Sequence, residues 1–191
     1  MGKGATTRSR ILDEAMRLAS REGLEGLTIG RLAKALSLSK SGLFVHFGSK
    51  EALQIAVLEH TLARFSEFVQ PALQAAPAGP DHLRAIFTGW LDWIDNPDLP
   101  GGCPVLGASF ELDDREGAPR DYLVARQVRT QAKLAEAFRE VAAPGADAEQ
   151  LVFELRAITL AYHYASRVMR DGRAREKACT AFEGLLQRAI G

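Results

Sequence analysis

The spacing of apolar residues constrains the fold of this 191-residue chain more than any other feature, because in almost every segment apolar residues recur at intervals of three and four positions. That spacing is the period of an α-helix with one buried face. Two segments near the C-terminus show it best, with stripes at Leu151, Leu155, Ile158, Tyr162, Ala165 and Met169 and at Ala178, Phe182, Leu185 and Ala189. No segment shows the strict alternation of a half-buried strand. The sequence therefore predicts an all-α protein.

Glycine, proline and capping residues divide this pattern into helices. Gly23 is expected to end the first helix, and a long helix is expected from Lys50 to about Val69, just before Pro71. Residues 72–80, rich in Ala, Pro and Gly, are predicted to be a linker. A helix rich in aromatic residues follows, then a loop over 96–104 and helices over 105–112, 119–143, 147–170 and 173–190.

The charge of the chain is unevenly distributed. Its 24 basic and 24 acidic residues cancel, which taken alone argues against a polyanionic partner. Residues 1–51, however, hold nine basic and five acidic residues, a charge of +4, and the remaining residues carry −4. A basic segment attached to an acidic body indicates a polyanion as the partner of the N-terminal segment.

Residues 28–47 have the proportions of a helix-turn-helix, with two short helices joined at 37–39 and Thr28 and Ser39 as caps. A helix of eight residues is about 12 Å long, which is close to the major-groove width of about 12 Å. Six apolar residues are expected to pack these helices on the first helix: Leu32, Ala33, Leu36, Leu43, Phe44 and Phe47. Four residues are left to face outward: Lys40, Ser41, Val45 and His46.

Residues 27–53 read LTIGRLAKALSLSKSGLFVHFGSKEAL and resemble the DNA-binding region of the tetracycline-repressor (TetR) family. The resemblance lies in the spacing of Ala33 and Leu38, the helix start Ser39-Lys40-Ser41-Gly42, and the segment His46-Phe47-x-Ser49-Lys50-Glu51-Ala52-Leu53. It covers about the first quarter of the chain. It implies a helix-turn-helix DNA-binding domain over 1–49 and a helical domain for effector binding and dimerisation over 50–191.

The same resemblance implies that eight residues contact DNA: Thr28, Ser39, Lys40, Ser41, Gly42, Val45, His46 and Lys50. Lys50 is expected to bind phosphate together with the positive end of its helix. One position departs from the family pattern, since Phe44 stands where a tyrosine hydroxyl commonly reaches a phosphate. Loss of one neutral hydrogen bond is expected to weaken binding by about 0.5–1.5 kcal/mol.

In the body, the resemblance implies a homodimer through roughly 147–190, which would present two DNA-binding domains to a palindromic operator. The alternative, that the C-terminal apolar stripes face their own core, stays open. A small, largely apolar or aromatic effector is expected to release the protein, a repressor, from double-stranded DNA. The candidate contacts of the effector, for each of which a place in the plain core is the favoured alternative, are Phe87, Trp90, Trp93, Phe110, Tyr122, Arg126, Tyr162 and His163.

The sequence leaves three other functions open. Cys103 lies in a segment that is predicted to be a flexible loop, which suggests a repressor that senses oxidants or electrophiles through this thiol. The alternative is that Cys103 is a loop cysteine without special reactivity. An enzyme is a remote alternative, because no catalytic motif is present and the four histidines lie in separate helices without metal-ligand spacing. No catalytic residue, metal or cofactor is therefore assigned. Residues 1–6 fit a myristoylation pattern but read better as a basic arm near DNA, and a cytoplasmic protein without a membrane partner is expected.

Overall fold

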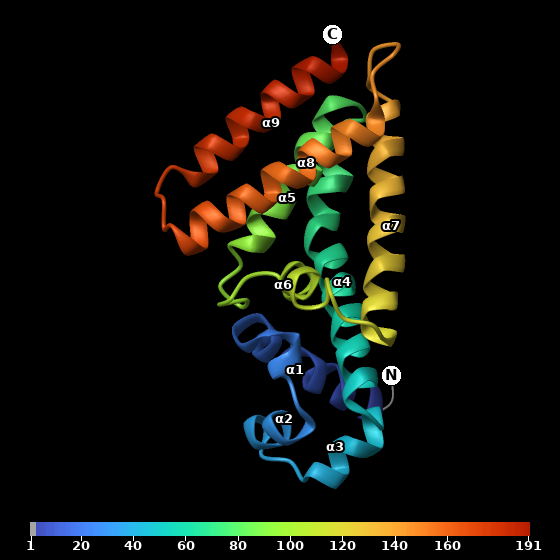
Figure 1. The fold of residues 1–191 in the computed structure, drawn as a ribbon, viewed down its shortest axis with the longest axis vertical. Coiled ribbons are helices and arrows are strands. Elements are labelled where there is room, and N and C mark those ends of the chain that lie inside the picture. Colours follow the sequence, from blue (N-terminus) through green and yellow to red (C-terminus); the bar gives the residue numbers. More distant parts are fainter. Residues whose placement is uncertain (1–2) are drawn as a thin grey trace. The chain divides into compact units, whose positions relative to one another are not determined.

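The computed structural model describes residues 3–191, and the side chains from residue 7 onward. Met1 and Gly2, and the side chains to residue 6, lie outside the described part, so the myristoylation pattern and the basic arm stay untested. The described residues form helices and no strand, as the all-α prediction requires (Figure 1). The helices are α1 (Lys3–Gly26), α2 (Ile29–Leu36), α3 (Lys40–Phe47), α4 (Lys50–Ala75), α5 (Pro80–Ile94), α6 (Pro104–Glu111), α7 (Ala118–Arg139), α8 (Ala148–His163), the π-helix η1 (Tyr164–Val168) and α9 (Ala174–Ile190).

The chain divides into two compact units. The first contains residues 1–66 and 95–125, and the second contains residues 67–94 and 126–191. The long helices α4 and α7 therefore each contribute residues to both units. The functional boundary placed after residue 49 concerns activity and remains a prediction.

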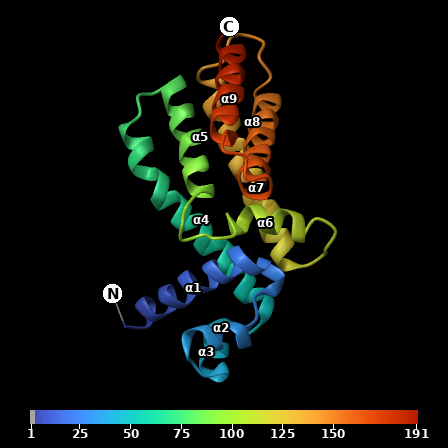
Figure 2. The same cartoon turned by 90° about the vertical axis from the view of Figure 1, so that its left-hand side faces the viewer.

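In the first unit, α1 packs against α2 and α6, and α2 packs against α3 (Figure 2). Leu32 of α2 and Leu43 of α3 are fully buried in the same core as Ala15 of α1. The loop before α6 is held against α1, because the Ser20 hydroxyl donates to the Gly102 carbonyl at 2.8 Å and accepts from the Gly101 N–H at 2.9 Å. A Cβ at Gly101 would lie 1.6 Å from the Ser20 carbonyl oxygen, so only glycine fits there. The loop is therefore anchored to α1 at Gly101 and Gly102.

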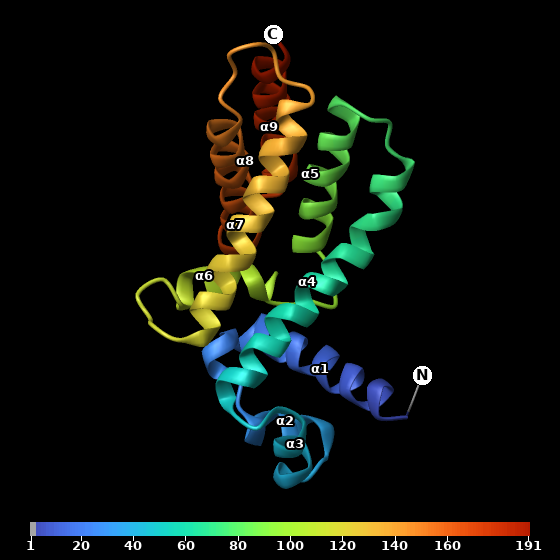
Figure 3. The same ribbon diagram turned by 90° about the vertical axis from the view of Figure 1, so that its right-hand side faces the viewer.

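In the second unit, α8 and α9 lie side by side and both contact α5 (Figure 3). Most of their predicted stripe residues belong to the core, Leu155, Tyr162, Phe182 and Leu185 among them, whereas Met169 at the end of the first stripe is 59% exposed. Dimerisation through those residues is therefore excluded by their burial within one chain. The reading left open from the sequence, that the stripes pack on their own core, is correct.

Four predicted boundaries need correction, the first being the helix predicted to run to 143, which ends as α7 at Arg139. Helix α4 continues to Ala75, because an internal proline such as Pro71 removes one hydrogen bond and bends a helix without having to end it. The linker is accordingly shorter than 72–80. The helix after Asp147 stops being α-helical at His163 and passes into η1, where the Arg167 guanidinium donates to the Ile94 carbonyl.

Candidate nucleic-acid interface

Helix α2 begins and ends where the sequence predicts. Thr28 is its N-cap, and the Thr28 hydroxyl oxygen accepts the N–H of Arg31 at 3.2 Å. Ser37 ends the helix in the left-handed conformation, with φ 54°, and the Leu38 N–H donates to the Ala33 carbonyl at 2.9 Å. The turn between the two short helices is thus fixed by local hydrogen bonds.

Helix α3 is positioned by its own cap. The Ser39 hydroxyl oxygen accepts the N–H of Gly42 at 3.1 Å and lies 3.3 Å from the Ser41 hydroxyl. Gly48 ends the helix, and its N–H donates to the Phe44 carbonyl at 2.8 Å. Thr28 and Ser39 therefore already have structural roles as caps, and a contact with DNA would be an additional role for each.

One face of α3 is buried and the other is open. Leu43 and Phe47 are buried, as predicted, whereas Phe44 is 54% exposed and Val45 is 85% exposed. The expectation that Phe44 packs on the first helix is wrong, because Leu43 and Phe47 already occupy the side of α3 that faces the core. The remaining residues of the predicted DNA contact are also exposed, namely Lys40, Ser41, Gly42 and His46.

The positive charges around α3 differ in how they are compensated. Within the part of the chain that the structure describes, Lys34 and Lys40 have no carboxylate partner, and both are exposed. Arg8 lies over the ring of Phe47, with 5.4 Å from its guanidinium carbon to the ring centroid. Lys34 and Lys40 thus give the surface an excess of positive charge beside α3.

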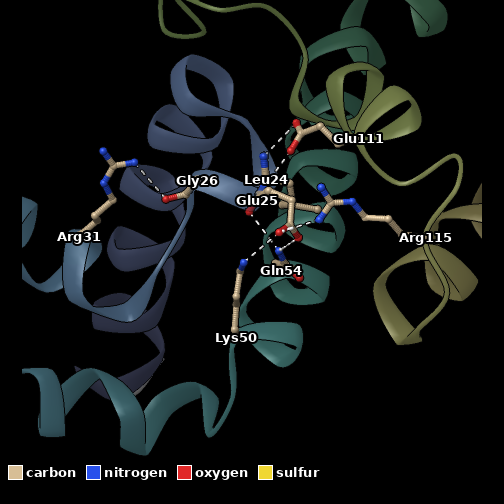
Figure 4. A network of polar contacts seen from close by, with 8 residues as sticks. All are labelled: Leu24, Glu25, Gly26, Arg31, Lys50, Gln54, Glu111 and Arg115. Carbon is tan, nitrogen blue, oxygen red and sulfur yellow. Dashed lines mark hydrogen bonds and ion pairs between the residues drawn. The ribbon is translucent and has the colours of Figure 1, made fainter.

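Lys50 is less free than the sequence suggests. Its ammonium group lies 3.1 Å from Oε2 of Glu25, which Arg115 also contacts at 2.9 Å, and the side-chain amide of Gln54 donates to Oε1 of Glu25 at 3.0 Å (Figure 4). Hydrogen bonds from Gln54 and Lys50 lower the pKa of Glu25 below its usual 4.5. The carboxylate is therefore ionised at neutral pH, and it partly neutralises Lys50.

A second carboxylate closes the end of α1. Gly23 interrupts the helix with φ 78° and ψ 164°, and the N–H groups of Leu24 and Glu25 beyond it donate to the two carboxylate oxygens of Glu111, at 3.0 and 2.8 Å (Figure 4). This contact joins α6 to the segment that leads into α2. Sequence reasoning missed it, because a single acidic residue 87 positions away carries no local signal.

The predicted effector contacts are divided between the two units. Phe110 and Tyr122 belong to the first unit, and Phe110 is 62% exposed. The other six belong to the second unit, where Phe87 stacks on Phe182 with 4.2 Å between ring centroids. These six are Phe87, Trp90, Trp93, Arg126, Tyr162 and His163.

His163 differs from its aromatic neighbours. Its Nδ1 atom is buried and has no hydrogen-bond partner among the described residues. Burial and then the nearby charge of Arg167 lower the pKa of the ring below 6.5, so the imidazole is neutral at pH 7. A neutral ring nitrogen can either donate or accept one hydrogen bond.

Other features of the described residues bear on the remaining functions. Cys103 precedes α6 and packs, half-buried, against the core of the first unit, which favours a structural role for its thiol over a sensing role. No cluster of three His, Cys, Asp or Glu side chains suits a metal ion in the described part. None of the helices described combines the length and the apolar character needed to cross a bilayer.

Comparison with known proteins places the chain among bacterial regulators. Residues 11–57 match the profile described as bacterial regulatory proteins, tetR family, and residues 79–182 match that of the tetracyclin repressor-like C-terminal domain. The HTH-type transcriptional repressor NicS of Pseudomonas putida is 42% identical over 98 residues, which are 49% of this chain and 44% of NicS. The curated relatives are matched over 30% to 55% of their own length.

Solved structures share the whole fold. A TetR transcriptional regulator from Chloroflexus aurantiacus superposes with a TM-score of 0.84 at 24% identity, covering 98% of this chain and 96% of that one. AibR in complex with isovaleryl coenzyme A and operator DNA superposes with a TM-score of 0.72 at 24% identity, covering 96% of this chain and 98% of AibR. At these identities the likeness concerns the fold alone.

Proposed function

The chain belongs to the tetracycline-repressor family of bacterial regulators, and from that premise we propose that it is a homodimeric repressor of transcription released from operator DNA by a small effector. The observation that carries the proposal is α3, a short helix with an exposed face, together with the exposed cations Lys40 at its start and Lys34 of α2, for which the described residues offer no carboxylate. Such a helix suits the major groove, while the cations suit the flanking phosphates. Residues 1–49 would bind DNA, and residues 50–191 would bind the effector and the second copy.

The proposed dimer would use a face of α8 and η1 that the sequence did not single out. Five exposed residues on this face of α8 and η1 follow one another at intervals of three or four positions, and we name them the α8 stripe: Phe153, Ala157, Ala161, Tyr164 and Val168. Large residues at the ends and alanines in the middle allow two helices to approach closely. An exposed apolar stripe of this kind supports an interface with a second copy.

The proposed effector is small and largely apolar or aromatic, with one polar group. The aromatic residues of α5 and the unpartnered Nδ1 of His163 in α8 support this chemistry. The effector would act by preferring a separation of the two α3 helices that differs from the 34–36 Å between successive major grooves. Tight binding without that preference would leave the repressor on its operator.

Selection from a random-sequence duplex library tests the proposal. We expect enrichment of a palindrome whose half-sites are about one helical turn apart, bound by two chains. A panel of aromatic and aliphatic compounds is then expected to include one that releases the selected duplex. Failure to enrich any duplex would refute DNA binding, and release by no compound would refute the effector.

A further inference from the structure

The exposed side of α3 combines two kinds of side chain that seldom occur together on a free surface. Ser41 lies three and four residues before Phe44 and Val45, so the three share one helix face, and Lys40 lies one turn before Phe44. We name Lys40, Ser41, Phe44 and Val45 the α3 surface. It presents a cation, a hydroxyl and two large apolar groups.

The apolar pair lies outside the buried face of the helix. Leu43 and Phe47 are buried and provide the packing of α3, whereas Phe44 and Val45 remain 54% and 85% exposed. Phe44 has no polar atom in its side chain, and neither has Val45. Their partner must therefore offer apolar groups.

The charge of the α3 surface points to an anionic partner, because Lys40, one turn before Phe44, has no carboxylate partner among the described residues. The major groove of DNA meets both requirements, since phosphates line its rims and the C5-methyl group of thymine is the apolar group that its base edges expose. We propose that Phe44 and Val45 bind thymine methyl groups, so that each operator half-site carries A·T pairs at the positions they reach. This inference rests on the proposed function and adds the base preference.

The test uses the full chain and the duplex selected from the random library. Each thymine is replaced singly by deoxyuridine, which removes one methyl group and leaves every hydrogen-bonding atom in place. We expect affinity to fall about fourfold at one or two positions of each half-site, because one buried carbon of this kind is worth a factor of about four. Placing 5-methylcytosine in a G·C variant at those positions should restore part of the affinity.

Variants assign the effect to the two side chains. Val45→Ala and Phe44→Ala should bind the thymine and the deoxyuridine duplexes equally well at the positions each residue reads. Val128→Ala, which changes a 59% exposed valine of α7, should keep the full fourfold difference. Circular dichroism checks that each variant is as helical as the parent chain.

Three outcomes would overturn the inference. Equal binding of all deoxyuridine duplexes by the parent chain would refute methyl recognition and leave the proposed function standing. A change of oligomeric state in Val45→Ala, with unchanged discrimination, would make the α3 surface a protein contact. Failure to select any duplex would refute both the inference and the proposed function on which it rests.

Discussion

The α3 surface and the α8 stripe both expose large apolar side chains, but their charged surroundings differ. Beside α3, Lys34 and Lys40 have no carboxylate partner among the described residues. Around α8 and α9 several cations are paired with carboxylates within the chain, as in the pairs Arg139–Glu149, Arg173–Glu176, Arg175–Asp92, Lys177–Asp171 and Arg188–Glu154, while Arg156 lies over the Trp90 ring and Arg167 donates to the Ile94 carbonyl. An apolar surface with free cations fits a polyanion, whereas one with neutralised surroundings fits another protein surface.

The largest expected effect comes from a charge placed in the α8 stripe. Ala161→Glu would bury an unpaired carboxylate between two copies, at a cost of several kcal/mol. We expect a monomer by light scattering and a loss of operator affinity of more than about 100-fold, because a single α3 reads few base pairs. Thr88→Glu places the same charge on an exposed position of α5 and should change neither. A dimeric Ala161→Glu would show that the stripe is not the interface.

The next effect concerns stability of the first unit. Gly23→Ala would force a side chain into a left-handed conformation and place its Cβ 2.7 Å from a Glu111 carboxylate oxygen. We expect the free energy of unfolding in urea to fall by about 2 kcal/mol, from backbone strain and the weakened Glu111 hydrogen bonds. Gly172→Ala is the matched control, since its Cβ would meet no atom within 4 Å. Equal stability of the two variants would contradict the role given to Gly23.

A third prediction compares a free lysine with a paired one. Lys40→Ala should weaken operator binding about fivefold. It should also reduce the magnitude of the slope of log affinity against log salt concentration by about two, because a dimer loses one phosphate contact in each chain. Lys177→Ala removes a lysine paired with Asp171 and should leave both quantities unchanged. Gel-shift titrations at four salt concentrations measure the slopes. Identical slopes of log affinity against log salt concentration for the two variants would contradict the claim that the α3 surface, and not the surroundings of the α8 stripe, contacts phosphates.

The smallest effect is the pH dependence due to Glu25. Because its pKa is lowered in the folded protein, its contribution to stability is present at neutral pH and is lost as the pH falls below about 4.5. Glu25→Gln should therefore be less stable than the parent chain at pH 7 by under about 1 kcal/mol, given solvent screening, and the difference should shrink toward pH 3. The exposed Glu116→Gln should show no such trend. A constant difference across this range would refute the assignment.

The helix-turn-helix could be read from the sequence because its signals are local. Thr28 and Ser39 each cap a helix through a contact three residues away, as the sequence indicated. The face used by each C-terminal helix could not be read, because periodicity shows that a stripe is apolar without showing what covers it. Leu155 and Phe182 are covered by their own chain, whereas Phe153 is not. The contact of Glu111 with α1 was equally hidden, since its partners are backbone groups far along the sequence.

The most direct test of the central claim is a titration of the selected operator duplex by fluorescence anisotropy over a series of salt concentrations. Two chains carrying Lys34 and Lys40 near phosphates should bind one duplex with a slope of about −3.6 in log affinity against log salt, from four phosphate contacts. Binding by one chain, or an affinity that hardly changes with salt, would contradict the assignment of α3 to DNA and of the α8 stripe to a second copy.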